Sequence, residues 1–298
     1  MGFLAEYIMR GRLQAMIVAS TLALISLVMP PVSIVSSGSI ALVTLRRGAF
    51  EGLMVLGCST AVVGGLGFFL LGNLQFVLLY GMVLWIPVWL ISIILREGRY
   101  LSLTIEIAVL IGVLGVICFY LYETDLAVMW VNVLSQVLPR NAPPVQDFKH
   151  TLDVISHYMT GIVVAASIFG MLFGLFLGRW WQALLYNPGG FKKEFLSLNT
   201  RPRLAIASVL VVVVAILSSG VISELSWNIS ILLFVMYTFI GTAVIHTLFA
   251  SMKMGRYMVP MFYITLFLIP HAMLPVSLVG LSDAWMNLRN KISNKHTS

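Results

Sequence analysis

The sequence has few charged side chains: only 10% of its 298 residues are Asp, Glu, Lys or Arg. Soluble globular proteins have about 25%, and 60% of this chain is hydrophobic. This composition excludes an ordinary soluble enzyme, a disordered chain and a nucleic-acid-binding domain. Most of the surface must face something other than water, and the lipid bilayer is the predicted partner.

Cysteines and catalytic motifs are also scarce. Cys58 and Cys118 are the only cysteines, and both lie inside apolar runs without a CxxC spacing. We expect both to be small buried apolar side chains, so they do not reveal a redox compartment. The chain has no HExxH, P-loop or GxGxxG motif. We therefore expect no enzymatic activity and no cofactor, and transport would need a gradient or a separate ATPase.

Long apolar runs dominate the chain and predict an all-α, polytopic transmembrane helical bundle. About 20 apolar residues cross a hydrocarbon core of roughly 30 Å, and helices satisfy their backbone groups within it. The last run contains three prolines, and a re-entrant course there would reduce nine crossings to eight. The nine runs are Leu13–Met29, Val32–Leu45, Ala49–Gly72, Leu74–Leu95, Leu101–Leu121, Val154–Gly178, Leu204–Ile222, Ile229–Ala250 and Met258–Leu281.

Basic residues indicate the orientation of these spans. The chain has 18 Lys and Arg against 11 Asp and Glu. With a cytoplasmic N-terminus, most basic residues fall on the inside, while the outer loops hold only Arg140 and Lys149. This asymmetry fits the positive-inside rule. The net charge of +7 is therefore interpreted as a topology signal and not as a nucleic-acid-binding surface.

Small residues recur every fourth position in three runs, which places them on one helix face. Such stripes allow helix backbones to approach closely in lipid. They predict packing within the chain or, for the first stripe, docking of a partner membrane protein. The three stripes are Ala15, Ala19 and Ala23; Gly57, Ala61 and Gly65; and Ala166, Gly170, Gly174 and Gly178.

Two tryptophans flank a proline in the middle of the fourth run. Pro87 kinks the helix, and Trp85 and Trp89 are one turn apart. They pack inside the bundle or form the wall of a ligand pocket. Ser36 and Ser37, at the hairpin formed by the first two runs, are further candidate ligand-binding residues.

His271 lies between Pro270 and Pro275 in the last run. The prolines leave backbone carbonyl groups without their helical donors. Those carbonyls and the His271 imidazole could line a substrate or proton path, although in a kinked helix water also hydrogen-bonds such carbonyls. An intramembrane serine hydrolase would need a serine beside such a histidine. Nothing in the sequence brings the two together.

Three residues near the start of the sixth run have metal-ligand chemistry. His150, Asp153 and His157 are spaced i, i+3 and i+7, so they share one face of a continuous helix. Imidazole and carboxylate groups bind zinc, nickel or cobalt. The alternative is a polar juxtamembrane turn without a metal.

Two segments lie outside the spans. Leu126–Leu138 is too short to cross a membrane and is predicted as an interfacial or re-entrant helix. The sequence Asn187, Pro188, Gly189, Gly190 predicts a turn. The six residues after that turn form an amphipathic piece whose lysines suit anionic headgroups.

The chain resembles the YybS-like family of uncharacterised bacterial polytopic membrane proteins. Two stretches carry the resemblance: residues 29–52, with Met-Pro-Pro and Leu-Arg-Arg-Gly-Ala-Phe-Glu-Gly, and residues 178–191, with Gly-Arg-Trp-Trp-Gln-Ala-Leu-Leu-Tyr-Asn-Pro-Gly-Gly-Phe. The resemblance implies a multi-pass protein of the bacterial inner membrane.

The first six runs also look like the substrate-binding S component of energy-coupling-factor vitamin transporters. That resemblance implies a six-helix core over residues 1–180, with Ala15, Ala19 and Ala23 docking a membrane coupling protein. A cytoplasmic loop over 181–203 and additional helices over 204–298 have no counterpart there. Metal-type S components carry a histidine at position 2, where this chain has Gly2.

The sequence therefore predicts a single integral membrane domain that binds or translocates a small solute. The alternative is a non-transport assembly protein that recruits a partner through the cytoplasmic loop 179–203.

Overall fold

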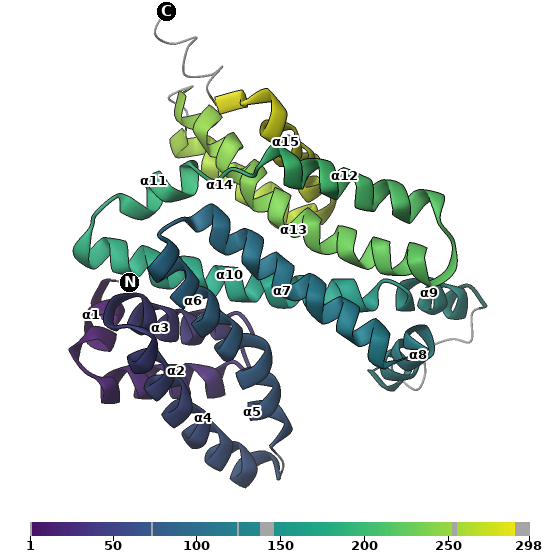
Figure 1. Ribbon diagram of the computed structural model, residues 1–298. Helices are drawn as coiled ribbons and strands as arrows, with labels where there is room; N and C mark the ends of the chain where they lie inside the picture. Colours follow the sequence, from purple (N-terminus) through teal and green to yellow (C-terminus); the bar gives the residue numbers. More distant parts are fainter. Residues whose placement is uncertain (1, 73, 124, 138–145, 252–254, 290–298) are drawn as a thin grey trace, which may run out of the picture. The chain divides into compact units, whose positions relative to one another are not determined.

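A computed structural model describes residues 2–72, 74–123, 125–137, 146–251 and 255–289 (Figure 1). All regular secondary structure within these ranges is helical, which confirms the all-α class. The helices are α1 (Gly2–Arg10), α2 (Arg12–Ile25), α3 (Val32–Arg47), α4 (Ala49–Leu71), α5 (Gln75–Tyr80), the π-helix η1 (Gly81–Trp85), α6 (Ile86–Gly98), α7 (Leu101–Tyr122), α8 (Leu126–Val137), α9 (Gln146–Ser156), α10 (Met159–Tyr186), α11 (Gly190–Leu196), α12 (Pro202–Leu217), α13 (Gly220–Ser251), α14 (Gly255–Leu268), the 3₁₀ turn η2 (Pro270–Ala272) and α15 (Met273–Met286).

Five helical stretches in the described residues are long and apolar enough to cross a membrane, or six if one bent pair counts as a span. The protein is therefore a multi-pass membrane protein, but eight or nine crossings are not confirmed. Three predicted spans are shorter helices. The 14 residues of α2 and the 16 each of α3 and α12 rise only about 21 and 24 Å, less than the hydrocarbon thickness of roughly 30 Å.

The predicted last span is broken. The helices on either side of Ile269 are bent by 119°, and the 3₁₀ turn that begins at Pro270 occupies the break. Proline lacks the amide proton that would continue the helical ladder, so the chain changes direction here. The break that the prolines predict is therefore confirmed, and the course is one of the two that the sequence left open, a broken span or a re-entrant loop.

The helices gather into two compact units. The first contains Met1–Ala108 and Ser167–Leu198, and the second contains Val109–Ala166 and Asn199–Ser298. Helices α7 and α10 each contribute to both units. This division differs from the predicted segments 1–180, 181–203 and 204–298. The predicted boundary at residue 180 falls inside α10, which is one continuous helix with residues in both units.

The alanine stripe of α2 packs inside the first unit. Ala15, Ala19 and Ala23 are at most 1% exposed, and Ser36 Oγ of α3 donates a hydrogen bond to the Ala19 carbonyl oxygen at 2.8 Å. This close approach of α2 and α3 is the contact that small side chains permit. Of the two predictions for this stripe, the structure has intramolecular packing.

The glycines of α10 also pack against α3. A Cβ atom on Gly174 would lie 2.3 Å from Ser37 Oγ, and one on Gly178 would lie 2.6 Å from the Ala41 Cβ. Gly170 is half-buried and Ala166 is exposed. Only the C-terminal half of this stripe is therefore a close helix contact.

The stripe of α4 has a different environment. Gly57, Ala61 and Gly65 are exposed. In the described part of the chain, no atom beyond the adjoining residues and backbone of α4 itself lies within 4 Å of a Cβ atom placed on Gly57 or Gly65. The same four-residue spacing thus marks an internal contact in α2 and an open face in α4.

The turn after α10 forms where the sequence predicts it. Gly189 has φ +82°, which glycine adopts without a steric cost. The short helix α11 then folds back, because Arg179 of α10 pairs with Glu194 and the rings of Phe191 and Phe195 pack on Phe176. The predicted amphipathic helix is confirmed, with Lys192 and Lys193 exposed.

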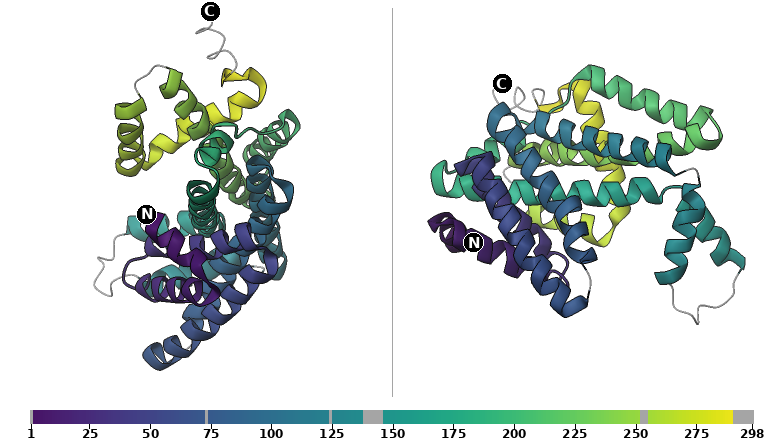
Figure 2. Two further views of the ribbon diagram at one scale, coloured as in Figure 1. Left: turned by 90° about the vertical axis from the view of Figure 1, so that its left-hand side faces the viewer. Right: turned by 60° about the horizontal axis from the view of Figure 1, so that its bottom comes forward.

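In the second unit, α12, α13 and α15 pack together (Figure 1). Helices α13 and α15 cross at Gly241 and Gly280, where a Cβ atom would lie 1.9 Å and 2.1 Å from the carbonyl oxygens of Val276 and Tyr237. Ser208 of α12 and Tyr237 of α13 share a hydrogen bond of 2.8 Å. The short helices α8 and α9 lie side by side (Figure 2).

Candidate functional site

The tryptophans and serines predicted to bind a ligand are parts of the first unit's packed interior. Trp85 is fully buried, and its Nε1 donates to Ser36 Oγ at 3.2 Å. Trp89 Nε1 donates to the Ala49 carbonyl oxygen at 2.9 Å, and Ser37 Oγ donates to the Ile34 carbonyl oxygen at 3.1 Å. The structure brings Trp85 and Ser36 together, but these four side chains already use their donors within the unit.

His271 lies in the second unit, in the 3₁₀ turn between α14 and α15, and is exposed. Its place at the proline-containing break agrees with the sequence prediction. A role in a substrate or proton path remains a prediction.

A cleft of about 380 Å³ lies in the second unit, between the α9–α10 turn and the α12–α13 turn. Its volume falls at the small end of the range for small-molecule pockets, about 300–1,000 Å³. The cleft is lined by Asp153, Val154, His157, Tyr158, Ser219, Gly220, Ser223, Glu224 and Trp227.

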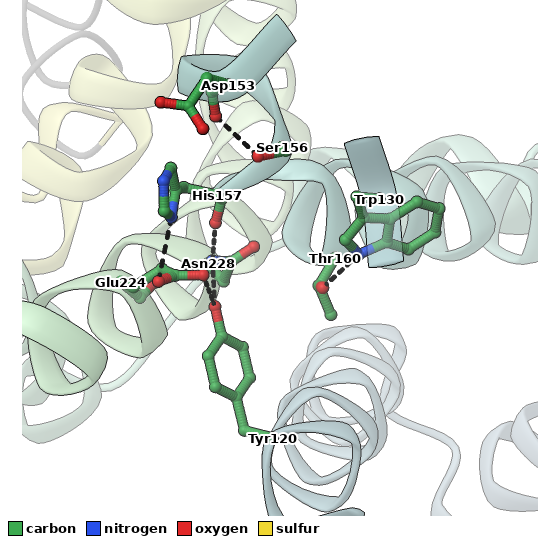
Figure 3. A network of polar contacts seen from close by, with 8 residues as sticks. All are labelled: Tyr120, Trp130, Asp153, Ser156, His157, Thr160, Glu224 and Asn228. Carbon is green, nitrogen blue, oxygen red and sulfur yellow. Dashed lines mark hydrogen bonds and ion pairs between the residues drawn. The ribbon is translucent and has the colours of Figure 1, made fainter. Parts of the chain in front are cut away.

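Glu224 of α13 is the central charged group of this cleft. Its side chain is 19% exposed. One carboxylate oxygen accepts a hydrogen bond from the Tyr120 hydroxyl at 2.9 Å, and the other lies 3.2 Å from His157 Nδ1 (Figure 3). Two donors from different elements therefore fix the direction of the carboxylate, which is the kind of pre-organisation that binding sites use.

Asn228 supports this arrangement from one helical turn away. It is fully buried. Its Nδ2 lies 3.0 Å from the Tyr120 hydroxyl oxygen, 2.7 Å from the His157 carbonyl oxygen and 2.8 Å from the Glu224 carbonyl oxygen (Figure 3). Its Oδ1 accepts from the Gly161 backbone N–H. One side chain thus ties α13 to α7 and to the start of α10.

Glycine at position 161 makes this contact possible. A Cβ atom there would lie 2.8 Å from the Cα and carbonyl oxygen of Asn228. Because glycine has no Cβ atom, α10 approaches α13 closely enough for the Gly161 N–H to reach the amide oxygen. On the neighbouring face, Trp130 Nε1 of α8 donates to Thr160 Oγ1 at 2.8 Å (Figure 3).

The break between α9 and α10 positions His157. Helix α9 ends at Ser156, whose hydroxyl donates to the Asp153 carbonyl oxygen at 2.6 Å. His157 and Tyr158 form the turn before α10. Turning the chain at this point lets the imidazole meet Glu224 instead of continuing along the face of α9.

This break also corrects the predicted metal-binding face. His150 and Asp153 lie on α9, while His157 follows its end, so the three residues do not share one continuous helix. Among the described residues there is no group of three His, Cys, Asp or Glu side chains that could hold a metal ion. The observed partner of His157 is Glu224.

Sequence reasoning missed Tyr120 and Asn228, and it left Glu224 outside the spans, between the runs that end at Ile222 and begin at Ile229. One signal was present: Glu224 and Asn228 are four residues apart, which places both on one face of a helix, and polar residues in an apolar helix are candidate functional groups. Their partners could not be found in the same way, because Tyr120 is 104 positions before Glu224.

Comparisons of the chain with models of protein families, with curated proteins and with solved structures found no match. The cleft itself shows which groups are available to a ligand. Its geometry offers a fixed carboxylate, an imidazole, hydroxyl groups and two aromatic side chains on one small concave surface.

Proposed function

We propose that this protein is a bacterial inner-membrane protein that binds a small solute at the cleft beside Glu224. The observation that carries the proposal is a carboxylate held by Tyr120 and His157 at the wall of a cleft. An ionisable group that a membrane protein holds in a defined position is a functional candidate by default. With the N-terminus in the cytoplasm, as the positive-inside rule predicts, the cleft opens on the outer side.

The proposal extends to translocation of the bound solute, as the resemblance to S components implies. A solute-binding cleft near the outer ends of the spans suits a protein that receives a solute from outside. The docking stripe implied by that resemblance is buried here, so a coupling protein would have to contact another face. Membership of the YybS-like family and the count of eight or nine spans remain predictions from the sequence.

Val154→Trp tests solute binding without changing any charge. Val154 is 45% exposed and lines the cleft, so an indole at this position fills space that a solute needs. We expect the thermal shift caused by a bound solute to disappear. A solute at 100 times its Kd stabilises a protein by about 2.7 kcal/mol, which makes the loss measurable.

The measurement is a thermal-shift screen of the purified protein against vitamins, amino acids, amines and divalent metals. Val128→Trp is the matched control, because Val128 is 54% exposed on α8 and does not line the cleft. A solute whose shift survives Val154→Trp, or a screen without any shift, would contradict the proposal.

A second candidate function is recruitment of a partner through the loop 179–203. The observation in its favour is that α11 is fixed against α10 and exposes two lysines. A fixed basic surface suits an acidic partner.

Reversing the charge of Lys192 and Lys193 together, to Glu, tests this second function. We expect a copurifying partner to be lost by at least about tenfold, because rim charges mainly control encounter. Arg10→Glu with Arg99→Glu is the control, since both arginines are exposed and lie outside the loop. Equal loss in the control would show that only total charge matters and would reject recruitment by this loop.

A further inference from the structure

The acidic groups that line the cleft accept hydrogen bonds. Glu224 and Asp153 are carboxylates, and Ser223 already donates its hydroxyl proton to the Ala215 carbonyl oxygen at 2.7 Å. Among the described residues that line the cleft, none is Lys or Arg. The one basic side chain is His157, and its Nδ1 is directed at Glu224. Tyr158, Ser219 and Trp227 can also donate, but the charged groups other than His157 only accept, so a ligand that donates hydrogen bonds finds charged acceptors in this cleft.

The charge of the lining leads to the same conclusion. Two carboxylates face the cleft, against a single imidazole. An anionic ligand would meet repulsion from both acids, whereas a cation would be attracted. Binding requires little reorganisation of the Glu224 carboxylate, because Tyr120 and His157 already hold it in place.

Aromatic side chains distinguish an organic cation from a metal ion. Trp227 and Tyr158 line the same cleft as the two acids. The faces of indole and phenol rings attract ammonium groups. A divalent metal instead needs several closely grouped ligands, and the described residues contain no such group of three.

We propose that the cleft recognises a small organic ammonium ion, with Glu224 and Asp153 as its counter-ions and Trp227 and Tyr158 as its aromatic walls. This inference rests on the proposed function and names the chemical class of the solute. The same ammonium chemistry occurs in free amines and in the headgroup of phosphatidylethanolamine, so the test must separate these two sources.

Isothermal titration calorimetry tests the inference on the full chain in alkyl maltoside micelles, which contain no ammonium group. The probes are choline, ethanolamine and 3,3-dimethylbutan-1-ol, a neutral compound with the shape of choline. We expect choline or ethanolamine to bind and the neutral compound to bind at least about tenfold more weakly, since it lacks the charge.

Three variants locate the binding energy. Glu224→Gln keeps an oxygen for the Tyr120 hydroxyl and removes the charge, so affinity should fall about tenfold. Asp153 is not part of the Tyr120–Asn228 contacts, so Asp153→Asn removes a negative charge from the cleft without disturbing those contacts. Trp227→Leu should weaken binding about threefold through the lost cation–π contact. Glu97→Gln, an exposed acid of α6, is the control and should have no effect.

A second arm uses bilayer nanodiscs that contain phosphatidylglycerol alone or with phosphatidylethanolamine. Glu224-dependent stabilisation by phosphatidylethanolamine, without binding of free amines, would support ammonium recognition. It would also overturn the proposed function, in which the ligand is a soluble solute.

Glu224-dependent binding of an anion, a neutral solute or a divalent metal would uphold a solute-binding cleft and overturn ammonium recognition. Amine binding unchanged in both acid variants would overturn it too. No binding of any probe would reject both proposals.

Discussion

Gly241→Ala should lower the free energy of unfolding by at least about 3 kcal/mol, at the upper end of the usual cost of overpacking. The added methyl group would lie 1.9 Å from the Val276 carbonyl oxygen, which is a backbone atom of α15 and cannot rotate away. Helices α13 and α15 would have to separate along their whole contact. A melting temperature lower by roughly 10 °C is expected for a chain of this size.

The sign of this change makes the experiment decisive. Glycine to alanine inside a helix normally stabilises by about 1 kcal/mol, because alanine loses less backbone entropy. Gly65→Ala is the matched control: in the described chain nothing beyond the adjoining residues and backbone of α4 itself lies within 4 Å of its added methyl group. Thermal unfolding in detergent should show Gly65→Ala unchanged or more stable and Gly241→Ala destabilised. Equal melting temperatures would show that the α13–α15 crossing is not as close as described.

Asn228→Ala should destabilise the second unit by about 2–4 kcal/mol. Hydrogen bonds between membrane helices average only about 0.6 kcal/mol, but this side chain contacts four groups, among them the backbone N–H of Gly161. A buried donor without a partner costs about 1–3 kcal/mol by itself. Chemical unfolding monitored by tryptophan fluorescence would measure the change.

Two further variants make this result specific. Tyr120→Phe removes only the hydroxyl that links Asn228 to Glu224, so we expect a smaller loss of about 1 kcal/mol together with weaker solute binding. Asn132→Ala, at an exposed position of α8, should change stability by less than about 0.5 kcal/mol. If Asn132→Ala and Asn228→Ala behave alike, the hydrogen-bond network around Asn228 contributes nothing.

Several features of this protein follow from short stretches of its sequence. Hydropathy is a sum over neighbouring residues, so apolar runs predict membrane helices before any packing is known. Turn chemistry is equally local: the bend at Gly189 and the break before His271 follow from glycine and proline. The short helix α8 and the amphipathic helix α11 were predicted for the same reason.

The roles of individual side chains needed the tertiary structure. Small residues at a four-residue spacing mark a shared face in α2 and in α4 alike, but only the neighbouring helices decide that Ala19 is buried and Gly65 is open. Likewise, the length of an apolar run does not reveal where a helix stops: α2 ends at Ile25 and α12 at Leu217, before the ends of the predicted runs.

The cleft shows most clearly what local patterns leave out. Its carboxylate is held by Tyr120 and His157, from α7 and the α9–α10 turn, and these side chains meet Glu224 only when three helices pack together. A helical pattern relates residues three or four positions apart. Hydrogen bonds between residues 67 to 108 positions apart depend instead on tertiary packing, which is why composition identified a membrane protein and only the folded chain identified its candidate site.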